Sequence, residues 1–158
     1  MEIIQINNKH REPLFQIIDK IELFNSEEKE CAKELIDIAI NNPSNEDYHI
    51  NVLLDKNNIV GYYCCGQRPL TAHTWDLYWI VVDKDKQRQG FGQILLKDAE
   101  NYIKKHNGKI LLIETSSQKI YHPTVKFYLK NNYQIAARIK DFYKDNDDLI
   151  IFSKYLID

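Results

Sequence analysis

Hydrophobic residues in the first quarter of the chain follow a strand pattern and then a helical one. Residues 1–6 predict a strand, and residues 13–24 predict a helix because their apolar positions recur at close to helical spacing. A second helix is predicted to begin at Asn25, which stands three residues before Glu28 as in a capping box. This second helix should end at residues 41–43, Asn-Asn-Pro.

Strand patterns dominate the rest of the chain. Residues 48–55 and 59–67 predict a hairpin, and the almost wholly apolar run over residues 74–83 predicts a strand in the middle of a sheet. The remaining predicted elements are a helix over 91–106, a strand over 109–115, a short helix from His122-Pro123, and strands over 133–142 and 149–155 joined by an acidic turn at 144–148. This order predicts a single mixed α/β domain over residues 1–158, with a sheet of about six to seven strands and about four helices.

Composition narrows the classes of function. The 158 residues are 44% hydrophobic and 28% charged, with a formal net charge of -2, as in an ordinary globular domain. Short basic spots such as Arg68-Pro69 predict solvated surface, and no broad basic field favours nucleic acid. No run approaches the roughly 18 apolar residues of a membrane span, and the first residues lack the features of a signal peptide. We therefore expect a cytoplasmic protein that binds neither nucleic acid nor membrane.

Cysteine and histidine positions predict neither a disulfide framework nor a metal site. Cys31, Cys64 and Cys65 are too few for such a framework, and no Cys/His spacing is typical of zinc. Because neighbours in a strand point to opposite faces, we expect Cys64 and Cys65 to be core residues. No oligomerisation element is evident in the sequence, so the oligomeric state, a homodimer included, stays open.

The stretch from residue 82 to residue 96 carries the most chemical information, because an apolar strand leads there into a turn and an amphipathic helix. Gly90 and Gly92 allow the backbone to curl so that successive N–H groups point inward, and a helix start adds about half a positive charge. Such a turn favours a diphosphate, although a tight turn without a ligand is the structural alternative. The turn lacks the Gly-Lys-Ser/Thr ending of an ATP-binding loop and the third glycine of a dinucleotide fingerprint.

The motif Gln87-x-x-Gly90-x-Gly92 resembles the acetyl-CoA loop of the GNAT superfamily of N-acetyltransferases. The predicted order of elements is also similar to that superfamily's order over nearly the whole chain. The resemblance implies that Gln87 braces the loop, that backbone amides hold the pyrophosphate, and that the preceding strand pairs with the pantetheine arm. The residues that it assigns to acetyl-CoA are Ile80, Val81, Val82, Gln87, Arg88, Gln89, Gly90, Phe91, Gly92, Gln93, Tyr121 and Tyr128. CoA would be the product, and no metal is implied.

Acetyl transfer to an amine needs a base for the amine and an acid for the departing thiolate, because a free alkyl ammonium has a pKa of about 10. The segment from Phe127 to Tyr133 resembles the superfamily's Phe-Tyr-x-x-x-Gly-Phe segment, in which the tyrosine hydroxyl points at the thioester sulfur. The resemblance makes Tyr128 the expected acid, with a plain core aromatic as the alternative. Asn132 replaces the glycine, and because asparagine tolerates left-handed backbone, the helix end should survive.

Two carboxylates are candidates for the base. Asp76 is the only acid in an otherwise buried run, and burial would raise its pKa. Strand alternation predicts the residues on its face, which are Tyr78, Ile80 and Val82. Asp76 stands four residues before Ile80, the spacing at which some superfamily members place a glutamate base. Glu114 is the second candidate, because in this superfamily its strand splays from its neighbour beside the thioester. A structural ion pair at Asp76, or a water chain in place of any base, stays open.

The acceptor is expected to bind beside exposed aromatic and acidic residues. Tyr121 stands where relatives often have an asparagine that touches the pantetheine. The expected acceptor-binding residues are Tyr78, Asp141 and Tyr143, beside the acidic turn at 145–148 and the connection between the first two helices. Acidic side chains there would favour a cationic amine, although a solvated hairpin turn also explains them.

The sequence therefore predicts an acetyl-CoA-dependent N-acetyltransferase that moves an acetyl group to a primary amine by direct attack on the thioester, with a small-molecule acceptor. Two alternatives stay open: a protein acetyltransferase that acts on a lysine or an N-terminus, and a non-catalytic acyl-CoA-binding module. A tyrosine at position 128 argues against the module. The fold cannot name the acceptor, because variable segments on the same frame bind different acceptors.

Overall fold

The strands of the protein are β1 (Glu2–Gln5), β2 (His49–Asp55), β3 (Asn58–Gln67), β4 (Thr74–Val82), β5 (Ile110–Ser116), β6 (Gln134–Lys144) and β7 (Asp147–Tyr155). In the computed structural model, which describes residues 1–157, they form one sheet in the order β1-β2-β3-β4-β5-β7-β6. The helices are α1 (Arg11–Asp19), α2 (Ser26–Asn41), α3 (Phe91–Lys105) and α4 (His122–Lys130). Only β4 and β5 pair in parallel, and the other neighbours are antiparallel. The mixed sheet with its helices confirms the predicted fold class.

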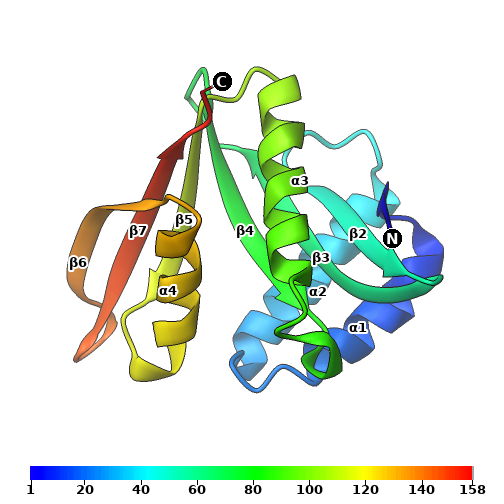
Figure 1. The fold of residues 1–158 in the computed structure, drawn as a ribbon, viewed down its shortest axis with the longest axis horizontal. Coiled ribbons are helices and arrows are strands. Elements are labelled where there is room, and N and C mark those ends of the chain that lie inside the picture. Colours follow the sequence, from blue (N-terminus) through cyan, green and yellow to red (C-terminus); the bar gives the residue numbers. More distant parts are fainter. Residues whose placement is uncertain (158) are drawn as a thin grey trace.

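The helices cover the two faces of the sheet in pairs. In Figure 1, α3 and α4 lie in front of the sheet, and α1 and α2 lie behind it. The buried residues form two clusters that match these layers, one under α3 and α4 and one under α1 and α2. Cys65 belongs to the first cluster and Cys64 to the second, so the adjacent cysteines are core residues on opposite faces, as predicted.

Capping chemistry sets the boundaries of the first two helices. The Asn25 side chain accepts a hydrogen bond from Glu28 N, and the Glu28 carboxylate accepts one from Asn25 N, each at 2.8 Å. This is the predicted capping box. α1 ends at Asp19, earlier than the predicted residue 24. The extended backbone of Asn25 (ψ 176°) prevents α1 from continuing into α2. Phe24 lies in the connection between the two helices, and its ring packs on the ring of Trp79 at a centroid distance of 4.8 Å.

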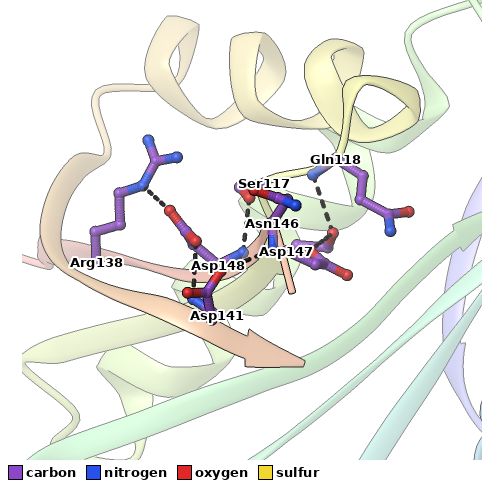
Figure 2. A network of polar contacts seen from close by, with 8 residues as sticks. Ser117, Gln118, Arg138, Asp141, Asn146, Asp147 and Asp148 are labelled. Carbon is purple, nitrogen blue, oxygen red and sulfur yellow. Dashed lines mark hydrogen bonds and ion pairs between the residues drawn. The ribbon is translucent and has the colours of Figure 1, made fainter. Parts of the chain in front are cut away.

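The β6–β7 hairpin is tighter than the acidic turn predicted at residues 144–148, because Asp147 and Asp148 belong to β7. Figure 2 shows the contacts that hold both side chains. Ser116 Oγ donates to the Asp147 carboxylate, and Arg138 Nε donates to the Asp148 carboxylate at 2.6 Å. Asp147 is only 6% exposed. The interpretation of these two residues as solvated turn residues is therefore wrong, because β5 and β6 supply their partners.

Loss of the Asn25 cap should weaken the protein. We expect Asn25→Ala to lower the free energy of unfolding by about 1 kcal/mol, because the amide of Glu28 loses its acceptor. Chemical denaturation followed by circular dichroism measures this change. Ser26→Ala, at the exposed first position of α2, is the control and should cost less than about 0.5 kcal/mol. Equal losses in the two variants would contradict the assigned cap.

Candidate active site

β4 and β5 run side by side for only a short distance. Residues 74–76 of β4 pair with residues 110–112 of β5. Within the described chain, the two strands pair no further, although β4 continues to Val82 and β5 to Ser116. Figure 1 shows them diverging toward the end of the molecule at which α3 and α4 begin. The β4 edge that faces β5 therefore keeps unpaired backbone groups beyond Asp76, which an extended ligand arm can use.

The loop between β4 and α3 presents free backbone N–H groups at this open end. Within residues 1–157, the amides of residues 88–92 donate to no backbone or side-chain acceptor. Arg88 and Gly90 have positive φ angles of 62° and 87°, a backbone geometry typical of anion-binding nests. The positive end of the α3 dipole lies at the same place. These residues fit a diphosphate such as the one in CoA.

The two glycines of the loop meet different needs. Gly90 precedes α3 with a left-handed backbone, which a side chain disfavours, although a Cβ there would meet no atom within 4 Å. A Cβ at Gly92 would lie 3.7 Å from the Phe127 ring and 3.9 Å from the Val82 side chain, so this position faces the space between β4 and α4. Gln87 reaches back to the Val82 carbonyl at 3.4 Å, a long hydrogen bond on the side where a bracing role was predicted.

A β-bulge interrupts β4 at Tyr78. Residues 64 and 65 of β3 pair with residues 79 and 77 of β4, which leaves Tyr78 without a ladder partner. Leu77 and Ile80 both pack under α3 although they are three residues apart. Asp76 therefore shares a face with Tyr78, as predicted, but the prediction that it also shares one with Ile80 and Val82 is wrong. The extra residue reverses the alternation of the strand.

Both candidate bases lie near one guanidinium group. Arg68 Nη1 donates to the Asp76 carboxylate at 2.8 Å and lies 4.0 Å from Glu114 Oε1. The Asp76 side chain is 14% exposed, and burial raises its pKa while Arg68 partly opposes that change. The Glu114 side chain is 45% exposed. The structure thus brings the two predicted carboxylates together where β4 and β5 begin to separate.

Tyr128 is buried between α4 and the sheet. It is 4% exposed, and its ring contacts Tyr133 and Phe152 at centroid distances of 5.6 and 5.5 Å. Burial raises the pKa of Tyr128, so its hydroxyl is protonated at neutral pH. None of the hydrogen bonds among the described residues involves this hydroxyl. The residue is buried but the hydroxyl oxygen keeps some contact with solvent, so its proton is available to a ligand atom.

Tyr121 connects the start of α4 to the segment between α1 and α2. It lies at the end of the 3-10 turn η3 (Lys119–Tyr121), directly before α4. Its hydroxyl donates to the Leu23 carbonyl at 3.2 Å, which links the start of α4 to the connection between α1 and α2. The structure therefore places the tip of this side chain on the side expected for the acceptor.

The predicted acceptor-binding residues differ in how much of each side chain is free. The Asp141 carboxylate accepts from Asn146 N at 2.7 Å and so stabilises the hairpin (Figure 2). Tyr143 is 48% exposed. Tyr78 is 37% exposed, and its ring meets the edge of Tyr48 at 5.5 Å. Burial, and to a lesser extent the negative charge of Asp76, raises the pKa of Tyr78 to about 12.

Arg68 is the site residue that the sequence reasoning assigned to solvated surface. The signal that could have found it is the β3–β4 hairpin, in which Gly66 pairs with Asp76. Arg68 stands two residues beyond Gly66, and such a diagonal neighbour lies within reach of a long side chain. The sequence alone does not define the register of this hairpin. The contact between Arg68 and Asp76 could therefore not be predicted from it.

The fold and the loop are typical of an acetyltransferase, and comparisons with known proteins agree. A family model described as an acetyltransferase (GNAT) domain matches residues 46–135, more than half of the chain. The chain therefore belongs to the GNAT acetyltransferase family. A search of curated protein sequences finds no significant match. The matched region contains the β4–α3 loop, Arg68, Asp76, Glu114 and Tyr128.

Solved structures support the same assignment. A protein from Desulfovibrio desulfuricans assigned to the GNAT family has a TM-score of 0.94 and 29% identity, with 99% of each chain covered. An aminoglycoside 6'-N-acetyltransferase complexed with coenzyme A has a TM-score of 0.77 and 16% identity, covering 100% of this chain and 98% of that one. The ribosomal-protein-S18-alanine N-acetyltransferase from Escherichia coli has a TM-score of 0.77 and 19% identity, covering 98% and 93%.

Two further findings concern the described residues as a whole. None of the helices within residues 1–157 combines the length and apolar character needed to span a membrane. The same residues contain no group of three or more His, Cys, Asp and Glu side chains arranged to hold a metal ion.

Charge placed at Gly92 should abolish binding of acetyl-CoA. We expect acetyl-CoA to raise the melting temperature of the wild type, and we expect no such rise in Gly92→Glu, because its carboxylate lies in the first turn of α3 beside the free amides. Differential scanning calorimetry with and without acetyl-CoA measures both. Asn101→Glu, an exposed position later in α3, carries the same charge and should keep the rise. No heat of binding in the wild type at millimolar acetyl-CoA would refute the assigned loop.

Proposed function

We propose that this protein transfers the acetyl group of acetyl-CoA to a primary amine of a small molecule by direct attack of the neutral amine on the thioester. The observation that carries the proposal is that the opening between β4 and β5 has free amides at one end and carboxylates at the other. The amides are those of residues 88–92 and the carboxylates are those of Asp76 and Glu114, and Tyr128 adds an unpaired hydroxyl under α4.

The cofactor side of the proposal rests on the loop and on the β4 edge. The amides of residues 88–92 can donate to the diphosphate oxygens, and the unpaired edge of residues 80–82 can pair with the pantetheine arm. A relative of similar fold was solved with coenzyme A. Bound acetyl-CoA would supply the activated acetyl group as a thioester.

The chemical side of the proposal needs a protonated acid and an ionised base, for which Tyr128 and Asp76 are the candidates. The raised pKa of Tyr128 keeps the hydroxyl protonated, as an acid for the departing thiolate requires. The raised pKa of Asp76 brings that carboxylate closer to the range of a useful base, while the hydrogen bond from Arg68 keeps it charged. Glu114 is the alternative base, because it is more exposed and lies farther from Arg68.

A small acceptor fits the structure better than a peptide. The hydrogen bond between Tyr121 and Leu23 crosses from the start of α4 to the α1–α2 connection. This contact narrows the acceptor side, which supports a small acceptor over an extended peptide. The comparisons include proteins named for small-molecule and for protein acceptors, so this contact, and not similarity, supports the proposal of a small acceptor.

Removal of the Tyr128 hydroxyl tests the acid. Tyr128→Phe should keep the fold and the affinity for acetyl-CoA but lower turnover by about 100-fold, the usual scale for loss of a positioned acid. A free-thiol release assay with an amine panel measures turnover, and calorimetry measures affinity. Tyr133→Phe, which removes a neighbouring buried hydroxyl bonded to Glu100, is the control for stability effects. Unchanged turnover in Tyr128→Phe would make Tyr128 a core residue.

The identity of the base can be read from pH profiles. A base works only as the carboxylate, so the raised pKa of Asp76 predicts that wild-type turnover falls as the pH drops through this value, at a higher pH than for an exposed aspartate. Asp76→Asn should lower turnover mainly at neutral pH and recover part of it at high pH, where the amine loses its proton unaided. Steady-state rates from about pH 4 to about pH 10 measure this, because the range runs from the ordinary aspartate pKa of about 3.9 to the amine pKa of about 10.

Glu114→Gln is the matched variant for the same profile. If Asp76→Asn has the wild-type profile and Glu114→Gln shows the loss at neutral pH, the base is Glu114. If neither variant changes the profile, deprotonation proceeds through water. An unfolded Asp76→Asn variant would assign the carboxylate to the ion pair with Arg68.

A further inference from the structure

The connection between α1 and α2 contacts the loop between β4 and α3 through an ion pair. Lys84 Nζ donates to the Glu22 carboxylate. Lys84 begins the 3-10 turn η2 (Lys84–Lys86), which lies between the end of β4 and the free amides of residues 88–92. The hydrogen bond from Lys84 lowers the pKa of Glu22, so this carboxylate is ionised at neutral pH. The connection is therefore joined to the loop that holds the diphosphate in the proposed transfer.

The next two residues of the connection contact two other elements. The Leu23 carbonyl accepts from the Tyr121 hydroxyl at 3.2 Å, on the side of the opening formed by β5 and α4. The Phe24 ring packs on the ring of Trp79 in β4 at a centroid distance of 4.8 Å. In Figure 1 the connection (blue) runs along the end of the molecule at which α3 and α4 begin. Residues 22–24 therefore span the opening from one side to the other, and we refer to them as the bridge.

The two helices hold the ends of the bridge. Lys29 Nζ donates to the Asp19 carbonyl at 2.8 Å, and Lys33 Nζ donates to the Asp19 carboxylate at 2.6 Å, which joins α2 to the end of α1. The capping box at Asn25 fixes the start of α2. The backbone freedom of the connection is therefore confined to the few residues between α1 and this cap, and the contacts of the bridge decide where they lie.

The ion pair is the weak contact of the bridge. The side chains of Glu22 and Lys84 are 80% and 52% exposed, and exposed ion pairs contribute little stability because holding two long side chains in one geometry costs entropy. A ligand that fixes the loop also fixes the backbone that carries Lys84. Part of the entropy cost of the pair is then already met, and the pair becomes stronger.

We propose that Lys84 and Glu22 are positioning residues that couple the cofactor loop to the acceptor side. Acetyl-CoA fixes the loop, the ion pair strengthens, and the bridge is held in place beside the acceptor. Because such coupling is reciprocal, an acceptor that binds against the bridge also raises the affinity for acetyl-CoA. This inference rests on the proposed function for its cofactor, but its test uses CoA and needs no acetyl transfer.

Hydrogen exchange followed by mass spectrometry measures the mobility of the bridge. In the wild type, saturating CoA should slow amide exchange of residues 20–25 by about two- to fivefold, the scale expected of one exposed ion pair. Glu22→Gln and Lys84→Gln should each speed this exchange in the free protein and remove most of the effect of CoA. Lys84→Arg keeps the cation and should keep the wild-type response.

Matched variants separate the ion pair from a general effect of charge. Glu30→Gln removes a carboxylate from an exposed position of α2, and Lys86→Gln removes a cation from an exposed position of η2. Both should keep the wild-type response to CoA. The double variant with Glu22→Gln and Lys84→Gln should respond like either single variant, because both remove the same contact.

Trp79 gives a second, spectroscopic measurement of the bridge. The protein has two tryptophans, and Trp75 lies in the other buried cluster, next to Tyr102 of α3. In a Trp75→Phe background the emission comes from Trp79 alone. Its indole nitrogen is buried and, in the described part of the chain, has no hydrogen-bond partner, so the emission should depend on whether the Phe24 ring covers it. CoA should change this emission, and Glu22→Gln should remove most of the change.

The outcomes separate this inference from the proposed function. CoA binding with the same protection of residues 20–25 in Glu22→Gln as in the wild type would overturn the coupling and leave the proposed function intact. Unchanged exchange of these residues in free Glu22→Gln would overturn the bridge itself. No binding of CoA to the wild type would refute the proposed function, and the coupling with it. If Trp75→Phe does not fold, hydrogen exchange in the native background decides.

Discussion

The brief parallel pairing of β4 with β5 is the constraint on which the rest of the site depends. A continuous ladder would join residues 77–82 to the following residues of β5 and leave no free backbone edge. Because pairing stops after Asp76, the backbone edge of β4 stays available and the two halves of the sheet separate. β5 pairs with β7 along the whole length of β5, and β6 pairs with β7. β5, β7 and β6 therefore diverge from β4 as one unit.

The separated strands place opposite electrostatic environments at the open end. On one side, the start of α3 adds positive partial charge to the free amides of residues 88–92. On the other side, burial and then nearby carboxylates raise the pKa values of Tyr121 and Tyr143, with Glu28 and Asp147 acting on both. In the proposed transfer, an anionic diphosphate and a cationic amine would be attracted to different parts of the same opening.

Arg68 lies at the narrow end of this opening, where its guanidinium group is close to side chains from both halves of the sheet. It bonds Asp76 on β4 and approaches Glu114 on β5, so one cation balances two carboxylates that would otherwise repel each other. The bulge at Tyr78 follows directly after Asp76 and turns residues 80 and 82 toward α3. The strand therefore presents an acid on one face and, a few residues later, apolar side chains toward α3 on the other face.

Sequence alone determined the elements and the loop, because both depend on local rules. The capping box at Asn25, the alternation of the strands and the glycines at 90 and 92 act through neighbours in the chain, so the fold class and the family followed from them. Tertiary structure decided what depends on register. The bulge at Tyr78, the ion pair of Arg68 with Asp76, and the burial of Asp147 in β7 against Ser116 in β5 each join residues that no local pattern relates. A one-residue change of register reverses a strand's faces, and only packing against both helical layers fixes which register is taken.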